Sequence, residues 1–192
     1  MDTIMGDRKQ FENAIEDAAI AFSDAKLQRT ILISHNDADG YSALAILQAL
    51  LTRKKIPSQY FIFNRERPWS EFLAPIFTSG QEGTAFIFSD LGGEISEIGR
   101  LFDGRPELAI ILDHHKPIDD GTPLPENVHF VNPVLAGFDG LKEVAGATVT
   151  YLFTKAIDLS AVKTAWLAVI GIAGDSLMHL DALRSYNLEI FE

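Results

Sequence analysis

Four short stretches of this sequence place carboxylate or imidazole side chains directly after a run of mostly apolar residues. In the first, residues 109–112 are apolar and lead into Asp113, His114 and His115. Such a run predicts a buried strand, and the end of a parallel strand presents polar side chains at the sheet edge where α/β folds bind ligands. A capped turn that happens to carry histidines would give the same pattern, so the choice depends on the other stretches.

The second stretch reads His-Asn-Asp-Ala-Asp-Gly at residues 35–40 and again follows an apolar run. His35, Asp37 and Asp39 occupy alternate positions, and alternate residues of an extended segment share one face. A calcium loop of the EF-hand type is excluded, because Ile46 would stand where that loop requires a bidentate glutamate. A simple Asp-Ala-Asp-Gly turn remains the alternative for this stretch.

The third and fourth stretches each end in a single aspartate. Asp90 follows residues 85–89, and Asp175 closes the apolar residues 168–174. One aspartate at such a place is more often a turn residue or a helix cap than a ligand. The recurrence of one pattern at four places favours a shared site over coincidence.

The donors in these stretches are imidazoles and carboxylates, without sulfur. That set suits manganese, magnesium or iron, and suits zinc less well. So many carboxylates in one place would repel one another strongly without a cation. Two metal ions about 3.5–4 Å apart, bridged by one aspartate, would relieve this repulsion and could activate a water for attack on phosphorus.

Taken in chain order, the four stretches resemble the four motifs of the DHH phosphoesterases: His-Asn-Asp-Ala-Asp-Gly at 35–40, Ser-Asp-Leu-Gly at 89–92, Asp-His-His at 113–115 and Ala-Gly-Asp at 173–175. The likeness is greatest to the RecJ-like branch, particularly its archaeal members, and it covers roughly residues 28–178. The pair Asn132-Pro133 and the triplet at residues 146–148, Gly-Ala-Thr, also fall where that branch has similar residues.

The resemblance implies a role for each motif residue. One metal ion would be held by His35, Asp37 and Asp90. The other would be held by Asp39, Asp90, His114 and Asp175, with Asp90 as the bridge. His115 would face the substrate phosphate, and Asp113 would orient a histidine. The ions implied are two Mn²⁺, with Mg²⁺ as the alternative.

The function implied is a two-metal-dependent phosphodiesterase that hydrolyses single-stranded DNA or RNA, as a RecJ-like exonuclease. Two other functions stay open. One is a scaffold in a replication complex that binds GINS with little or no activity, as in a related eukaryotic replication factor. The other is a phosphatase or phosphodiesterase for short oligonucleotides or small nucleotides.

Composition limits the setting in which this chemistry would occur. With 192 residues, of which 47% are hydrophobic and 22% charged, the chain can form one globular domain over residues 1–192. The absence of cysteine excludes disulfides and thiolate zinc sites and fits the cytoplasm. No membrane-spanning segment or N-terminal signal is visible, so no membrane partner is expected.

The net charge of −11 argues against a broad nucleic-acid-binding surface on this domain itself. In RecJ-like proteins a second, DHH-associated domain follows and helps to hold the substrate. By that resemblance, residues 179–192 are expected to lead towards such a domain.

The elements that must position these residues alternate along the chain. Continuously apolar strands that alternate with helices predict an α/β fold, with a mostly parallel sheet of about five strands and helices on both faces. The predicted strands span residues 30–34, 58–63, 84–89, 108–112 and 127–131. The predicted helices span residues 7–25, 41–53, 69–77, 94–102, 145–157 and 161–173.

A few further residues invite a functional interpretation. Arg65, Arg67 and Trp69 could contact nucleic acid by phosphate pairing and base stacking, with a solvated loop carrying one aromatic anchor as the alternative. His179 lies close to Asp175 in sequence and is a candidate for contact with substrate. Phe86 and Phe88 are expected in the core, and His129 is expected to be an ordinary strand residue.

Overall fold

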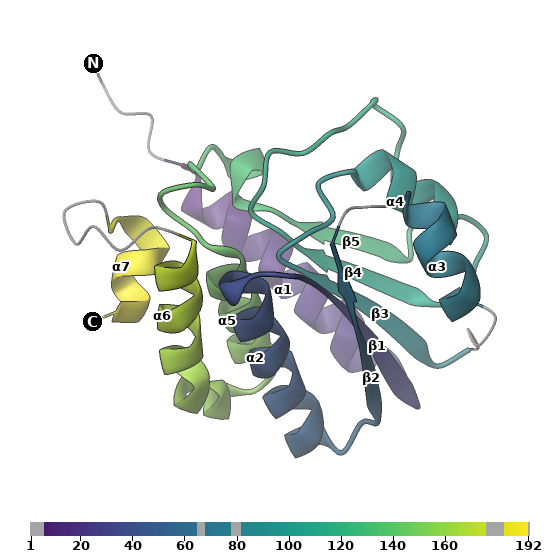
Figure 1. Cartoon of the computed structure of the whole chain (residues 1–192), viewed down its shortest axis with the longest axis horizontal. Coiled ribbons are helices and arrows are strands. Elements are labelled where there is room, and N and C mark those ends of the chain that lie inside the picture. Colours follow the sequence, from purple (N-terminus) through teal and green to yellow (C-terminus); the bar gives the residue numbers. More distant parts are fainter. Residues whose placement is uncertain (1–5, 65–67, 78–81, 176–182, 192) are drawn as a thin grey trace.

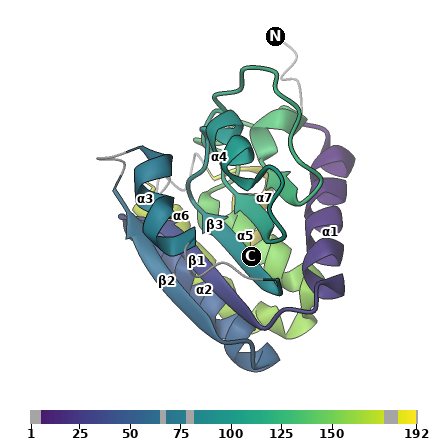
Figure 2. The same ribbon diagram turned by 90° about the vertical axis from the view of Figure 1, so that its right-hand side faces the viewer.

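The computed structural model describes residues 6–64, 68–77, 82–175 and 183–191. Its centre is a parallel sheet of five strands in the order β2-β1-β3-β4-β5, which confirms the predicted fold class. The strands are β1 (Arg29–His35), β2 (Ser58–Phe63), β3 (Thr84–Ser89), β4 (Leu108–Leu112) and β5 (Val128–Val131). Figure 2 shows β2 as an open edge of this sheet.

Helices cover both faces of the sheet, as predicted (Figure 1). The described α-helices are α1 (Arg8–Asp24), α2 (Ala38–Lys54), α3 (Trp69–Phe77), α4 (Ile95–Phe102), α5 (Gly146–Ile157), α6 (Ala165–Gly174) and α7 (Ser185–Phe191). Two 3₁₀ segments, η1 (Pro133–Ala136) and η2 (Leu159–Thr164), connect some of them. Helices α1, α2 and α5 pack on one face, and α3 and α4 pack on the other.

Strand β1 shows why the apolar runs become central strands. Ile31 and Ile33 belong to the core cluster beneath α3 and α4, whereas Leu32 belongs to the cluster beneath α1, α2 and α5. All three side chains are fully buried, because successive residues of a strand point to opposite faces and both faces are covered. The expected core positions Phe86 and Phe88 are confirmed in the same way.

Helices α6 and α7 form an outer layer beside the sheet. Ala168 of α6 packs with Ala43 of α2 and with Ala147 and Tyr151 of α5. Helix α7 contacts α6 and α5, and it lies beside α6 in the view of Figure 1. The end of α6 and the starts of α2 and α5 are therefore brought together next to the sheet.

Two predicted helices differ from the structure by more than one residue at a boundary. Helix α2 begins at Ala38 rather than at residue 41, because Asp37 is its N-cap and accepts a hydrogen bond from the backbone N–H of Gly40 at 2.9 Å. Asp39 therefore lies in the first turn of a helix, and not in an extended segment with His35 and Asp37. The predicted helix 161–173 is divided into the 3₁₀ segment η2 and the helix α6.

Other predictions concern single residues and the membrane. His129 is confirmed as a strand residue, half-buried in the edge strand β5. Arg65, Arg67 and His179 lie outside the described residues. Among the helices in the described ranges, none is both long and apolar enough to cross a membrane.

Candidate metal centre

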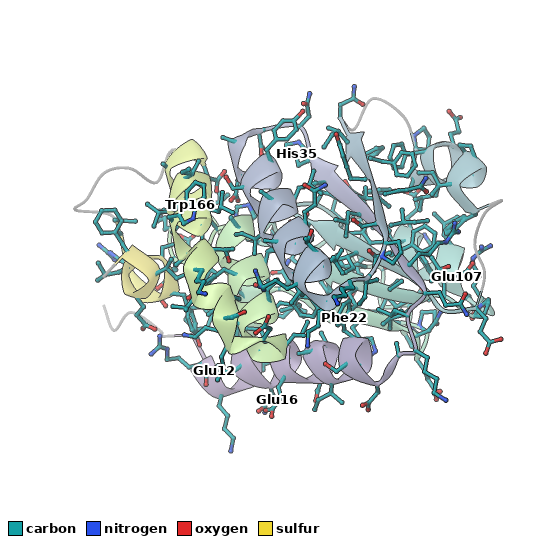
Figure 3. The ribbon with its side chains drawn as sticks, turned by 90° about the horizontal axis from the view of Figure 1, so that it is seen from below. Glu12, Glu16, Phe22, His35, Glu107 and Trp166 are labelled. Atoms are coloured by element: carbon teal, nitrogen blue, oxygen red, sulfur yellow. The ribbon has the colours of Figure 1, made fainter. Side chains whose placement is uncertain are left out.

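The predicted motif residues meet at the carboxyl edge of the sheet. Ser34 at the end of β1 pairs with Ser89 of β3, and Ser89 pairs with Leu112 of β4. His35, Asp90 and Asp113 each stand at or just beyond these neighbouring strand ends. Figure 3 shows His35 beside the start of α2, whereas Glu107 lies apart from it, just before β4 begins.

This position in the sheet follows from its strand order. The chain passes from β1 to β2 on one side and then returns to place β3 on the other side of β1. The ends of β1 and β3 therefore form a switch point, where neighbouring connections leave in opposite directions and open a crevice for a ligand. His35 and Asp90 lie at this point.

Asp90 lies at the centre of the cluster and is 1% exposed. Its Oδ2 lies 3.6 Å from Nδ1 of His35, and its Oδ1 lies 3.1 Å from Nε2 of His114. Its φ of 58° is in the left-handed region, where asparagine and aspartate are better tolerated than most residues. Backbone strain of this kind is concentrated at functional sites.

His114 is oriented from behind by the main chain. Its Nδ1 lies 2.7 Å from the carbonyl oxygen of Gly140, so an N–H at this position donates to that oxygen. Nε2 then faces the carboxylates, 3.1 Å from Oδ1 of Asp90 and 3.8 Å from Oδ2 of Asp39. A histidine that ligates a metal through one nitrogen commonly donates its other N–H in this manner.

Asp39 is held by the start of α5. Its Oδ2 accepts a hydrogen bond from the backbone N–H of Gly146 at 2.7 Å, and its Oδ1 accepts one from Ala147 at 2.9 Å. The positive end of the α5 dipole faces the same carboxylate. Burial, together with the charge of Asp90, nevertheless raises the pKa of Asp39 well above its usual value.

His35 and Asp37 lie at the more exposed side of the cluster. Nδ1 of His35 is 2.5 Å from Oδ2 of Asp37. The interaction with Asp90, and further the charge of Asp37, raise the pKa of His35 although its partial burial lowers it. Asp37 thus both caps α2 and contacts a candidate ligand.

Asp113 contacts His115 rather than a candidate ligand. Its Oδ1 accepts hydrogen bonds from Nδ1 of His115 at 2.7 Å and from the backbone N–H of His114 at 2.9 Å. The side chain of Asp113 is fully buried, whereas that of His115 is 29% exposed. The buried carboxylate therefore orients an imidazole that solvent can reach.

Asp175, at the end of α6, completes the cluster. Its Oδ2 lies 3.7 Å from Nδ1 of His114, and burial raises its pKa. The structure thus places every predicted site residue in one cluster, although Asp113 contacts the ring of His115 and the main chain of His114 and belongs to none of the candidate ligand groups.

Three groups of side chains within this cluster are close enough to share a cation. In each group the ligand atoms lie within 4.8 Å of one another. The groups are His35, Asp37 and Asp90; Asp39, His114 and Asp175; and Asp90, His114 and His115. The third group shows that a ring nitrogen of His115 is also close enough to contact a cation. The role expected for His115 from the sequence was contact with the substrate phosphate.

The residues present fit divalent cations. Both carboxylate oxygens of Asp90 and Nε2 of His114 are buried and make no hydrogen bond to any described residue. Buried polar atoms are rarely left so, because desolvation costs about 1–3 kcal/mol for each unsatisfied group. Oxygen and imidazole donors in this arrangement match the ligand preferences of Mn²⁺ and Mg²⁺.

Without a cation, His114 supplies the compensating charge. Burial lowers its pKa, but the interactions with Asp90 and Asp39 outweigh burial and raise the pKa to about 10. Burial likewise raises the pKa of Asp90, yet His114 and His35 hold it well below its usual value. The positive charge of protonated His114 thus offsets the negative charge of the carboxylates, which a bound metal ion would otherwise do.

Divalent metal is expected to stabilise the protein. A ligand at 100 times its Kd contributes about 2.7 kcal/mol, which corresponds to a rise in Tm of about 5–10 °C for a domain of this size. Thermal unfolding in millimolar MnCl₂ and in EDTA measures the shift. The variant Asp119→Asn/Asp120→Asn, in the loop after β4, should keep the shift, and an unchanged Tm of the parent protein would contradict a metal centre.

Gly171 of α6 allows the close approach of three elements at Asp39. A Cβ at this position would lie 2.4 Å from Oδ1 of Asp39 and 2.4 Å from Cβ of Ala147. Gly146 is similarly close to Asp90, with a Cβ distance of 2.7 Å to its Oδ1. Small residues at these two points are therefore a steric requirement of the site.

The substitution Gly171→Ala is expected to destabilise the protein by about 1–3 kcal/mol through overpacking and to weaken Mn²⁺ binding. Alanine would otherwise favour a helix interior by about 0.5–1 kcal/mol. Denaturant midpoints and Mn²⁺ titration measure both effects. Gly99→Ala in α4 is the matched control, because its closest contact would be only the end of the Leu124 side chain, and equal behaviour of the two variants would refute the steric argument.

Sequence reasoning missed several residues that shape the site. Gly140 supplies the carbonyl that orients His114, Gly171 admits Asp39, and Asn187 supports the start of α5. Isolated glycines and an asparagine give no ligand-type signal. The triplet at residues 146–148 was noted only through a resemblance, and its contacts with Asp39 explain its place here.

Of the two interpretations of Trp69, the structure supports the aromatic anchor and not the contact with nucleic acid. Trp69 is 3% exposed and stacks on Phe63, with ring centroids 4.0 Å apart. Its Nε1 donates a hydrogen bond to Glu94 at 3.2 Å. The indole is therefore a core residue between β2 and α4, and cannot stack on a base.

Comparison with solved structures identifies the fold. Over 92% of this chain and 46% of the other, the structure superposes on exonuclease RecJ bound to manganese, with a TM-score of 0.71 and 24% identity. This chain has the DHH-domain fold of RecJ. The same fold is shared with CDC45 from Entamoeba histolytica, with a TM-score of 0.59 and 18% identity over 88% of this chain and 33% of that one.

Sequence comparison adds one relative of greater identity. The uncharacterised protein MJ0831 of Methanocaldococcus jannaschii is 33% identical over 149 residues, which is 75% of this chain and 32% of that protein. No family model matches the sequence. The chain spans about a third of this relative and just under half of the RecJ chain.

Proposed function

We propose that this chain is a two-metal-dependent phosphodiesterase of the RecJ-like branch that hydrolyses single-stranded DNA or RNA as an exonuclease. The placement of the Asp90 carboxylate is the observation that carries the proposal. Its Oδ2 lies towards His35 and its Oδ1 towards His114, and both oxygens are buried without a hydrogen bond to the described residues. A carboxylate shared by two ligand groups is what a two-ion site requires.

The candidate ligands would divide into two sets that share Asp90. His35, Asp37 and Asp90 would hold one ion; Asp39, Asp90, His114 and Asp175 would hold the other. When bound, a pair of divalent ions lowers the pKa of a shared water and neutralises charge on the phosphoryl oxygens. The start of α5 and the carbonyl of Gly140 keep Asp39 and His114 oriented for this role.

His115 is suited to contact the substrate phosphate. Asp113 engages its Nδ1 at 2.7 Å, so Nε2 is the nitrogen left for the substrate. An imidazole held in this way can donate a hydrogen bond to a phosphoryl oxygen or a proton to the leaving oxygen. Asp113 contributes by fixing the orientation of the ring.

The comparisons support the proposed metal. How the nucleic acid is held is a separate part of the proposal. The RecJ structure with the same fold was determined with bound manganese, which supports Mn²⁺ here, with Mg²⁺ as the alternative. Because the matched proteins are longer than this chain, we propose that this catalytic domain works together with a further domain that helps to hold the nucleic acid.

A second function is favoured by charge. The chain carries 27 acidic residues against 16 lysines and arginines, and a long polyanion gains most of its affinity from basic groups. A phosphodiesterase or phosphatase for dinucleotides and other short substrates needs few such contacts. An acidic domain with a small, polar metal centre fits this substrate class.

A replication-complex role is the remaining alternative. The fold shared with CDC45 permits a scaffold that binds GINS or another replisome protein. The cluster of candidate ligands around Asp90 favours an enzyme, since a scaffold has no need of buried carboxylates without hydrogen bonds. The two roles do not exclude one another.

One assay separates these functions. The purified chain is incubated with Mn²⁺ and end-labelled single-stranded DNA, RNA or dinucleotides, and the products are resolved by length. Stepwise shortening of the polymers supports the exonuclease, and cleavage of dinucleotides alone supports the small-substrate function. Full occupancy by Mn²⁺ with no cleavage of any substrate would refute the enzyme and favour the scaffold.

A further inference from the structure

The first turn of α5 has partners on two sides. On the side of the metal centre, the N–H groups of Gly146 and Ala147 donate to the carboxylate of Asp39. On the other side, Oδ1 of Asn187 accepts hydrogen bonds from the backbone N–H of Ala145 at 3.0 Å and from the hydroxyl of Thr148 at 2.6 Å. Asn187 is fully buried in α7, 42 residues from Ala145 in sequence.

The local sequence of α5 gives this turn no anchor of its own. Its N-cap is Ala145, which makes no side-chain cap hydrogen bond. Alanine is a poor N-cap, and replacing a capping side chain by alanine costs about 0.5–2 kcal/mol of helix stability. Asn187, from another helix, accepts from the backbone N–H of the N-cap residue Ala145, a bond that the N3 side chain makes in a capping box.

Helix α7 is itself fixed against the body of the protein. The backbone N–H of Asn187 donates to the carbonyl of Glu143 at 3.1 Å. Next to it, Tyr186 packs edge-on against Phe11 with ring centroids 5.4 Å apart, and its hydroxyl donates to Glu12 at 2.9 Å. In Figures 1 and 3, α7 lies beside α6. From this position α7 contacts α5 and, through Tyr186, also α1.

The orientation of Asp39 depends on where this turn lies. Both of its oxygens accept from the two N–H groups, and Gly171 packs so closely that a Cβ there would lie 2.4 Å from Oδ1 of Asp39. A shift of the turn would therefore rotate the carboxylate or remove one of its donors. Nε2 of His114, 3.8 Å from Oδ2 of Asp39, would then lose its neighbour in the second ligand group.

We propose that Asn187 is a positioning residue for the metal centre: by holding Ala145 and Thr148 it fixes the two N–H groups that orient Asp39 for metal binding. The proposal rests on the proposed function in one respect, namely that Asp39 is a ligand. Beyond the proposed function, it requires that α7 contributes to metal affinity although α7 does not contact the metal.

The test is Mn²⁺ affinity of the full chain, measured by calorimetric titration or from the electron paramagnetic resonance signal of free Mn²⁺. Asn187→Ala is expected to raise the Kd of the weaker-binding ion about 10- to 100-fold, the usual cost of removing a residue that orients a ligand. Thr148→Val keeps the shape of the side chain but loses the hydroxyl, and should raise the Kd in the same direction. Thr148→Ser keeps the hydroxyl and should restore the affinity of the parent protein.

A matched control distinguishes positioning from general loosening of α7. Tyr186→Phe removes the hydrogen bond to Glu12 and weakens the attachment of α7, but leaves Asn187 and the start of α5 in contact. This variant should lower Tm while its Mn²⁺ Kd stays that of the parent protein. An equal rise in Kd for Tyr186→Phe would overturn the specific role of Asn187.

The remaining outcomes each decide the proposal. Unchanged Mn²⁺ affinity in both Asn187→Ala and Thr148→Val would overturn it, and if Asn187→Ala does not fold, the pair Thr148→Val and Thr148→Ser decides alone. A parent protein that binds Mn²⁺ but cleaves no phosphodiester refutes the proposed function and leaves the role of Asn187 to stand on the affinities. A parent protein that binds no Mn²⁺ overturns both.

Discussion

Replacing Asp90 by asparagine is expected to reduce Mn²⁺-dependent phosphodiester cleavage by about 100- to 1,000-fold or more. Removal of a single group that stabilises transition-state charge has an effect of this size. The substitution keeps the shape of the side chain, and asparagine tolerates the left-handed backbone at this position as aspartate does. The variant loses the negative charge, and one ligand oxygen is replaced by an amide nitrogen, so the side chain would be unable to act as the proposed bridge between two ions.

Calorimetric titration measures the same change without a substrate. We expect the number of bound Mn²⁺ ions to fall below two, while circular dichroism of the metal-free variant matches that of the parent protein. Asp103→Asn, at an exposed aspartate after α4, is the control and should keep activity and stoichiometry. Unchanged turnover of Asp90→Asn with two ions bound would show that Asp90 is not the bridge.

Replacing His115 by alanine is expected to slow cleavage by about 100- to 10,000-fold, the usual contribution of a general acid or base, while Mn²⁺ binding is retained. The reason is that His115 is partly exposed and is oriented by Asp113, whereas His114 is buried and faces Asp39 and Asp90. Activity and Mn²⁺ stoichiometry are measured on one preparation. His114→Ala should lose metal as well as activity.

The contrast between these two histidines is the informative result. Because a ring nitrogen of His115 lies within 4.8 Å of ligand atoms of Asp90 and His114, it is also placed to bind a cation. Loss of one Mn²⁺ from His115→Ala would therefore reassign His115 as a ligand. His129→Ala, in the edge strand β5, is the control for loss of an imidazole elsewhere and should behave as the parent protein.

The central strands β3 and β4 were predicted well because each is a largely apolar run that is buried on both faces of the sheet. The bounds of β2, β3 and β4 agree with the residues predicted. Helix α2 was predicted to begin three residues late, because Asp37 and Asp39 were both taken as strand-end ligands. Asp37 is also the N-cap of α2, and a capping aspartate and a ligand aspartate have the same appearance in sequence.

The residues that form the cluster could be predicted from the sequence, but the tertiary contacts that orient them could not. Asp39 accepts hydrogen bonds from Gly146 and Ala147, which follow it by 107 and 108 positions in the chain. Local sequence patterns contain no information about such contacts. The sequence left two interpretations of Trp69 open for a related reason, because a tryptophan near a loop has no signal for the Phe63 ring that stacks on it. Ligand types are visible in a sequence, whereas tertiary contacts that orient them are visible only in a structure.

The main-chain origin of the hydrogen bonds to Asp39 has a consequence for mutagenesis. Every residue type except proline carries the same peptide N–H, so exchanging Ala147 for glycine or serine leaves both donors in place. Side-chain substitutions at this position therefore cannot reveal that a candidate ligand depends on its N–H group. Exchange of the peptide bond before Ala147 for an ester, by chemical ligation, would delete one donor alone and expose that dependence.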